Sequence, residues 1–325
     1  MKKKVVVVGG GTGTFVVLSG LKQYDLDICA VIAMTDSGGS TGKLRDQLGV
    51  LPPGDLRQAL VALSASEDIW RDLFLYRFEN GDLDGHNFGN IFISALEKIT
   101  GSIEKSINIA TKILDVKGKI IPVTFQKSDL CIRLVDKTFI VGETHIDEPT
   151  QFENRSKIQK AFLQPKVLIN PEVLRVFKEA DLIVIGPGDL YTSIIPNFLV
   201  DGVSQAFQQS KAKKVYVLNL TTKLGQTTNY TATDHITDLE KYIGKNILDY
   251  VLVNNKQPTQ NALDWYLKKK EMVVEDNIKN SNFSVIRKDL ISTTVYKKSK
   301  SDKLVRSLIR HNSNKLAKEL LKLLN

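Results

Sequence analysis

The stretch Val5-Val6-Val7-Val8-Gly9-Gly10-Gly11-Thr12-Gly13-Thr14 decides the fold of this chain. Four consecutive valines predict a strand buried on both faces, because a strand with one solvated face alternates apolar and polar residues. Glycines follow this strand directly, and residues 15–21 then show helical periodicity. A buried strand, a glycine-rich turn and a helix are typical of the first unit of a Rossmann-like, doubly wound α/β fold.

Short apolar runs alternate with helical patterns along most of the chain, which predicts a mostly parallel sheet with helices on both faces. The expected strands are 5–8, 28–34, 119–123, 166–169, 182–185, 215–218 and 250–253. The expected helices are 15–21, 55–64, 91–99 and 103–114, and Gly101 and Ser102 serve as stop signal and N-cap between the last two.

A hairpin is expected from 130–135 and 138–141, which are joined across Asp136 and Lys137. We place it in a small antiparallel insertion around 125–165, with 144–164 as a polar surface excursion. No repeat or low-complexity linker divides the chain, so we expect one domain over 1–325.

Composition excludes several classes of protein. Hydrophobic residues make up 42% and charged residues 25% of the 325 residues, as in globular proteins. No apolar run reaches the roughly 20 residues that a membrane-spanning helix needs. Cys29 and Cys131 both lie in apolar segments, which argues against a disulfide scaffold and favours the cytoplasm.

The net charge of +9 is concentrated at the C-terminus, where residues 291–325 carry a net +7. The leucines at 316, 320, 323 and 324 recur at helical spacing among lysines, which favours a solvated helix face. The alternative is a docking surface for an anionic partner. Nucleic acid is not expected, because aromatic side chains do not interleave with the basic residues.

The first glycine cluster comprises Gly9, Gly10, Gly11, Thr12 and Gly13. Glycine lets backbone N–H groups approach an anion, and the helix that follows adds a favourable dipole, so we expect phosphate binding here. The cluster does not match the dinucleotide fingerprint, because the last glycine position falls on a threonine or a valine. A tight turn without a ligand is the alternative.

A second polar cluster follows the strand expected at 28–34. Its candidate binding residues are Asp36, Gly38, Gly39, Ser40, Lys43 and Arg45. Asp36 suits ribose hydroxyls or a metal ion, and the two cations suit phosphates. A flexible charged loop is the alternative.

Two further segments carry candidate catalytic residues. Asp55 follows Pro52-Pro53-Gly54 and fits a helix N-cap that still directs Arg57 toward the crevice. His86, Asn87 and Asn90 lie at a helix start and suit anion contact or general acid chemistry. Asp36, Asp55 and His86 are therefore the catalytic candidates. No His/Cys/Asp cluster has zinc-ligand spacing, so no metal site is firm, with Asp36 as the one candidate ligand.

Later strand ends supply more donors. The candidates are Gly186, Gly188, Leu190, Tyr191 and Ser193 after 182–185, and Asn219 and Thr221 after 215–218. Strand ends meet in one crevice of a doubly wound sheet. The spacing indicates a site for a nucleotide or phosphoester and names no reaction.

Taken in order, these motifs resemble the YvcK branch of the CofD-like, 2-phospho-L-lactate transferase family over nearly the whole chain. Pro52-Pro53-Gly54-Asp55 and Gly186-Pro187-Gly188 are the most specific segments, and Tyr266 and Arg310 also match. The resemblance implies a Rossmann-like, cytoplasmic bacterial protein, often named gluconeogenesis factor. Such proteins are linked to carbon flux, cell-wall synthesis and cell shape, and to binding of UDP-sugars such as UDP-N-acetylglucosamine.

The resemblance leaves an alternative function open. The sister branch is a Mg²⁺-dependent enzyme that transfers a phospholactyl group from a guanosine diphosphate donor. Ser37 stands where the pattern has a second aspartate, which weakens the case for Mg²⁺. Asp189, Gln226 and Asn312 also depart from the pattern, where serine, glutamate and aspartate are usual. A cell-wall-related protein partner and a homo-oligomer remain open as expectations.

Overall fold

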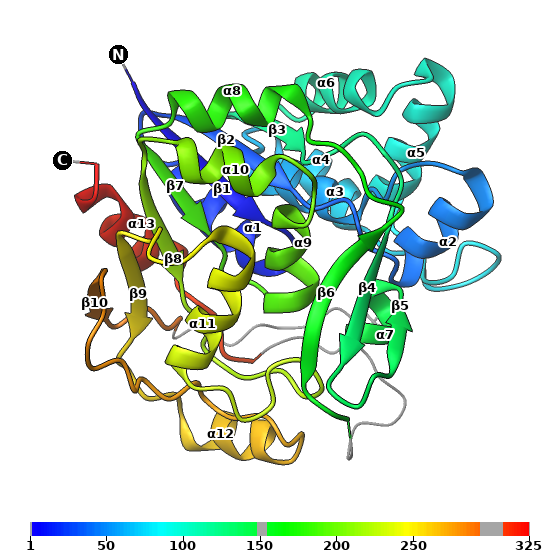
Figure 1. Cartoon of the computed structure of the whole chain (residues 1–325). Helices are drawn as coiled ribbons and strands as arrows, with labels where there is room; N and C mark the ends of the chain where they lie inside the picture. Colours follow the sequence, from blue (N-terminus) through cyan, green and yellow to red (C-terminus); the bar gives the residue numbers. More distant parts are fainter. Residues whose placement is uncertain (1, 148–154, 293–307, 325) are drawn as a thin grey trace.

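The computed structural model describes residues 2–147, 155–292 and 308–324 (Figure 1). Its main sheet has seven strands in the order β10-β9-β8-β7-β1-β2-β3, and every neighbouring pair is parallel. These strands are β1 (Lys3–Gly9), β2 (Leu26–Ile32), β3 (Lys119–Pro122), β7 (Leu182–Ile185), β8 (Lys213–Val217), β9 (Tyr250–Asn254) and β10 (Ser284–Lys288). The predicted mostly parallel, doubly wound α/β fold is confirmed.

Strand β1 lies at the point where the strand order reverses. It pairs with β2 on one side and with β7 on the other, and its four valines are fully buried. In open α/β sheets, ligands bind outside the carboxyl ends of the strands at such a reversal. The glycine cluster that follows β1 therefore opens into the expected crevice.

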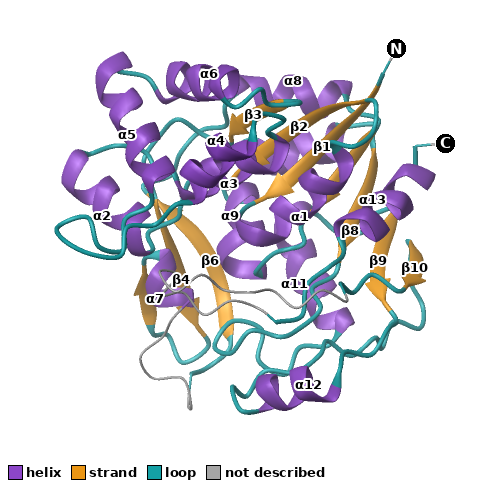
Figure 2. Ribbon diagram, turned by 180° about the vertical axis from the view of Figure 1, so that it is seen from behind, coloured by secondary structure: helices purple, strands orange, loops and turns teal. Residues whose placement is uncertain are grey.

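Helices cover both faces of the sheet (Figures 1 and 2). One face carries α1 (Gly11–Leu21), α3 (Gly54–Leu63) and α13 (Ser313–Lys322), which meet along α1. The other face carries α8 (Pro171–Glu179), α9 (Ile195–Phe198), α10 (Val203–Gln209) and α11 (Ala232–Ile243). Further helices are α2 (Gly39–Leu48), α4 (Asp68–Leu75), α5 (Phe88–Thr100), α6 (Ile103–Ile113), α7 (Glu143–Asp147) and α12 (Gln260–Leu267). Within the described ranges, no helix is long and apolar enough to cross a membrane.

A small antiparallel sheet projects beyond the carboxyl ends of the main strands (Figure 1). It contains β4 (Asp129–Leu134), β5 (Phe139–Val141) and β6 (Ile158–Gln164) in the order β5-β4-β6. The antiparallel pairing of β4 and β5 confirms the expected hairpin, which turns through Lys137 at a φ of 72°.

Two of the predicted boundaries are wrong. Residues 166–169 form no strand and contribute only a single bridge through Leu168, whereas β6 occupies the segment expected to be a polar excursion. The burial of β6 does not alternate regularly, because its pairing with β4 shifts register, so its sequence lacks the usual period of two.

The expected caps of α5 and α6 are present. Gly101 ends α5 in the left-handed conformation, and the Ser102 side chain accepts the Lys105 N–H at the start of α6. Asp55 is not the N-cap of α3, because Pro53 occupies that position and Asp55 lies within the first turn. The C-terminal leucine pattern does form a helix, α13, with Leu316 and Leu320 fully buried.

Candidate functional site

A cavity of about 1750 Å³ lies at the carboxyl ends of β1, β2, β7 and β8. The loops after these strands form its base, α7 borders one side, and the end of α12 borders the other. Sixteen of the predicted site residues line it: Gly10, Gly11, Thr12, Gly13, Asp36, Gly38, Gly39, Ser40, Asp55, Asn90, Gly188, Ser193, Asn219, Thr221, Tyr266 and Arg310. The cavity exceeds the roughly 300–1,000 Å³ of usual ligand pockets.

The glycine cluster packs so closely against its surroundings that side chains are excluded. A Cβ on Gly10 would lie 2.3 Å from Asp55 Oδ2, and one on Gly13 would lie 2.1 Å from the Pro187 carbonyl oxygen. The Gly11 N–H donates to Asp55 Oδ1 at 2.9 Å. The α1 N-terminus thus already holds one carboxylate, and its other unpaired N–H groups belong to the next residues of the first turn.

Three carboxyl groups form an acidic wall, which comprises Asp36, Asp55 and Glu143. The Asp36 carboxylate accepts the Gly38 N–H at 2.9 Å, and Glu143 accepts the Ser37 N–H at 3.4 Å. Burial raises the pKa of Asp36; burial and the Asp36 charge raise the pKa of Asp55 to about 7. The same causes raise the pKa of Glu143 to about 9. Asp55 is therefore partly neutral and Glu143 largely neutral at pH 7, and a neutral carboxyl both donates and accepts hydrogen bonds.

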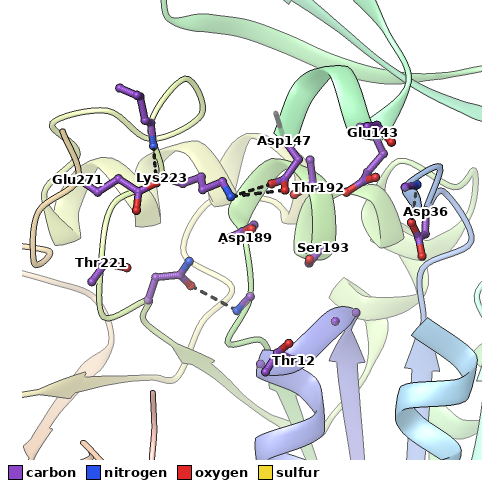
Figure 3. A pocket seen from close by; sticks show the side chains of 18 of the residues that line it. Thr12, Asp36, Glu143, Asp147, Asp189, Thr192, Ser193, Thr221, Lys223 and Glu271 are labelled. Atoms are coloured by element: carbon purple, nitrogen blue, oxygen red, sulfur yellow. Dashed lines mark hydrogen bonds and ion pairs between the residues drawn. The ribbon is translucent and has the colours of Figure 1, made fainter. Parts of the chain in front are cut away.

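Opposite this wall, Lys223 lies among carboxylates (Figure 3). Its Nζ forms an ion pair with Asp147 Oδ1 at 3.3 Å. Burial lowers the pKa of Lys223, but the charges of Asp189, Asp147 and Glu271 outweigh it and raise the pKa above its ordinary value. Lys223 is therefore charged, and it links α7 of the small sheet to the loop after β8.

A π-helix, η1 (Leu190–Ile194), follows β7 and separates its residues into two sets. Leu190 and Tyr191 are buried in the core, and the Tyr191 hydroxyl donates to Asp238 Oδ2 of α11 at 2.5 Å. Thr192 and Ser193 line the cavity instead. The buried hydrogen bond between Tyr191 and Asp238 therefore anchors η1 on its core side, and Thr192 and Ser193 of the same turn line the cavity.

Several predicted site residues lie outside the cavity. Lys43 is exposed, and Arg45 pairs with Asp129 at 3.0 Å near a smaller pocket. His86 Nδ1 lies 3.3 Å from Ser40 Oγ, and burial with the nearby cations lowers its pKa. Three more predicted residues, Gly9, Asn87 and Gly186, lie behind the cavity surface.

The far side of the cavity is formed by residues from α12 and from the segment before α13. Tyr266 is 2% exposed, and its hydroxyl accepts the Ile309 N–H at 3.4 Å. Lys269 lies over the Trp265 ring at 3.8 Å from its centroid. His311 is buried beside Arg310, and burial lowers its pKa to about 4, so it is neutral at pH 7.

The acidic wall does not form a ready-made metal site. No group of three His, Cys, Asp or Glu side chains in the described ranges is arranged to hold a metal ion. With Ser37 in place of a second aspartate, the residues present do not fit a preformed Mg²⁺ site.

Comparison with known proteins identifies the family. The sequence model described as 2-phospho-L-lactate transferase CofD matches residues 5–291. The chain belongs to the CofD family. A relative from Thermotoga maritima is 42% identical and the match covers 97% of both chains. The relative from Bacillus subtilis named gluconeogenesis factor is 38% identical, over 99% of this chain and 98% of its own. A crystal structure of a protein from Bacillus halodurans superposes with a TM-score of 0.90 at 37% identity and covers 99% of this chain and 100% of that chain.

The departures from the CofD-like pattern have structural counterparts. Burial raises the pKa of Asp189 to about 6, and the nearby Lys223 lowers it. Gln226 donates from Nε2 to Asp147 Oδ1 at 2.9 Å, where a glutamate would place two carboxylates together. The two departures therefore belong to one charge arrangement around Lys223.

Sequence reasoning missed much of this arrangement. Glu143, Asp147, Lys223 and Glu271 belong to no glycine-rich motif. Position relative to strand ends was the one available signal, because Lys223 follows Thr221 and Thr222 after β8. Glu143 and Asp147 of α7 line the cavity because the small antiparallel sheet, which α7 follows in the chain, packs beside it.

Proposed function

We propose that the cavity binds a nucleotide diphosphate sugar of the UDP-N-acetylglucosamine type. We further propose that the chain acts as a ligand-responsive regulator of gluconeogenic carbon flux, cell-wall synthesis and cell shape. The single observation that carries the binding proposal is that the α1 N-terminus and Arg310 both line the same cavity. A helix start and an arginine are the two protein groups best suited to a diphosphate.

The proposed ligand pose follows the chemistry of the walls. Thr12 and Gly13 provide backbone donors for the diphosphate, since the Gly11 N–H donates to Asp55 and the Gly188 N–H donates to Asn219 Oδ1 at 3.4 Å. Asn219 and the partly neutral carboxyls of the acidic wall provide partners for ribose and sugar hydroxyls. The names of the relatives support a regulatory role in carbon metabolism.

Isothermal titration with UDP-N-acetylglucosamine and with GDP, each with and without Mg²⁺, tests this proposal. We expect saturable UDP-sugar binding that does not depend on Mg²⁺. Arg310→Ala removes a charged contact worth about 1.5–3 kcal/mol, so the Kd should rise roughly ten- to a hundredfold. Arg175→Ala, on the exposed face of α8, is the control and should leave the Kd unchanged. Absence of binding at millimolar ligand would contradict the proposal.

A phospholactyl transferase is the second candidate, and the acidic wall is the observation that favours it. In this reading Asp36 and Asp55 orient the acceptor of the transferred group. The test is formation of product from a lactyl-diphosphoguanosine donor in the presence of Mg²⁺, beside an active transferase as control. Product formation that is lost in Asp55→Asn would favour the enzyme, and its absence would remove it.

A further inference from the structure

Arg57 is a buried cation in the cavity wall that needs specific partners. It extends from α3, and only 7% of its surface is exposed. Its Nε donates to Asn90 Oδ1 at 2.8 Å, and its Nη1 donates to the Phe74 carbonyl at 3.3 Å. A buried guanidinium is stable only when its donors are satisfied in this way.

The start of α5 is shaped around this arginine. A Cβ on Gly89 would lie 2.7 Å from Arg57 Cδ and 2.8 Å from the Phe74 carbonyl oxygen, so a larger residue would displace the arginine side chain. Asn90 also donates to Thr41 Oγ1 at 3.2 Å, which fixes its amide orientation. We call Asn87, Gly89 and Asn90 the arginine cradle.

Asn87 completes the cradle from the other side. Its Nδ2 donates to the carbonyls of Leu75 at 3.0 Å and Tyr76 at 2.9 Å, and its Oδ1 accepts the Asn90 N–H at 3.2 Å. These bonds hold the end of α4, where Phe74 presents its carbonyl to Arg57. The polar residues at the start of α5 are thus directed at protein groups.

Arg57 lines the same cavity as Asp36 and Asp55 of the acidic wall. Although burial dominates the pKa values of Asp36 and Asp55, the Arg57 charge lowers both. Any carboxyl of the wall that is ionised repels a diphosphate, and the positive charge of Arg57 offsets this repulsion. Arg57 therefore provides the charge that makes this side of the cavity compatible with an anion.

We propose that Arg57 is a binding residue for the anionic ligand and that Asn90 and Gly89 act as positioning residues that hold its guanidinium at the cavity wall. The inference rests on the proposed function. The sequence predicted that Asn87 and Asn90 contact the anion directly. In this proposal they affect ligand binding by holding Arg57 in place.

A double-mutant cycle measures this dependence. The Kd for UDP-N-acetylglucosamine is determined for the unsubstituted protein, Arg57→Gln, Asn90→Ala and the double variant. We expect each single variant to raise the Kd about tenfold and the double variant to match Arg57→Gln. Arg57→Lys keeps the charge but lacks the Nε donor, so Asn90→Ala should add nothing in that background either.

Asn170→Ala is the matched control. Asn170 is also a buried asparagine at a helix start, with its amide bonded to the Pro122 carbonyl at 3.0 Å, but it caps α8 away from the cavity. The Asn170→Ala variant should lower the melting temperature and leave the Kd for UDP-N-acetylglucosamine unchanged. If Asn90→Ala does not fold, Asn90→Ser, which is too short to reach Arg57 Nε, takes its place.

The outcomes separate the two proposals. Additive effects in the cycle, or binding by Arg57→Gln that equals the unsubstituted protein, would overturn the inference while leaving the proposed function in place. Absence of UDP-N-acetylglucosamine binding by the unsubstituted protein would overturn both.

Discussion

Glu143 lies beside other carboxyl groups in the cavity wall, and this crowding changes its pKa and its contribution to stability. Burial, together with the charges of Asp36 and Asp147, raises its pKa from the ordinary 4.5 to about 9. The unfolded chain loses this proton near pH 4.5, whereas the folded chain keeps it until about pH 9. Glu143 therefore adds no such penalty below pH 4.5, and its unfavourable contribution to stability grows as the pH rises from 4.5 toward 9.

Glu143→Gln should therefore raise the melting temperature clearly at pH 8 and very little at pH 5, because glutamine stays neutral at both. Thermal unfolding at the two pH values measures the difference. Glu104→Gln, on the exposed surface of α6, is the control and should behave alike at both. Equal effects of Glu143→Gln at pH 5 and pH 8 would show that its carboxyl is ionised in the folded protein.

Of the individual site residues, the sequence predicts those that lie in the segments following strands. Thr12, Asp36 and Ser193 lie in the segments that follow strands of a parallel sheet, so their meeting in the cavity follows from the fold class. Glu143 lies at the same cavity only because the small sheet packs there, and this packing leaves no local signal in the sequence. Tyr191 was expected at the ligand, but the π-helix directs it into the core.

The π-helix η1 is held against α11 by a buried polar group, Asp238. Asp238 of α11 accepts the hydroxyls of Tyr191 and Tyr230 at 2.5 and 2.6 Å and pairs with Lys241. Hydrogen bonds to a charged group contribute about 1.5–3 kcal/mol. This cluster therefore fixes η1, and with it Thr192 and Ser193, against α11.

Tyr191→Phe should lower the free energy of unfolding by roughly 1–3 kcal/mol, because Asp238 loses a charge-assisted donor in a buried site. Urea unfolding measures the change. Tyr76→Phe, at a tyrosine that is 50% exposed, should alter stability by less than about 0.5 kcal/mol. A Tyr191→Phe variant as stable as the unsubstituted protein would mean that the cluster does not secure η1.

Elements with strong local patterns are those that the sequence predicts. The strands of the main sheet are continuous apolar runs, and Ser102 and Gly101 carry cap signals that do not depend on distant residues. β6 is different, since its register shift removes the alternation that would mark it. β10 pairs only at the sheet edge and is partly exposed, so its apolar signal is weak.

For the whole molecule, the packing of α1 against α13 is the contact that ties the two ends of the chain together. A Cβ on Gly20 would lie 2.2 Å from the Ser313 carbonyl oxygen and 3.0 Å from the Ala317 Cβ. Glycine inside a helix ordinarily destabilises it by about 1 kcal/mol relative to alanine. Its presence here reflects the close approach of the two helices.

Gly20→Ala should therefore destabilise the protein by about 1–3 kcal/mol, opposite to the effect of helix propensity, because the backbone of α13 must move. Ser19→Ala, one position earlier in the same helix, should be neutral or slightly stabilising. Chemical unfolding of the two variants compares them. A Gly20→Ala variant more stable than the unsubstituted protein would show that α13 adjusts freely.

The path of the chain also sets the order in which the site can be completed during synthesis. The glycine cluster at the start of α1 is synthesised roughly three hundred residues before Arg310 and the helix that packs on Gly20. A nascent chain halted before residue 308 has most strand ends in place and still lacks that side of the cavity. The binding proposed for this cavity therefore requires that residue 310 has left the ribosome.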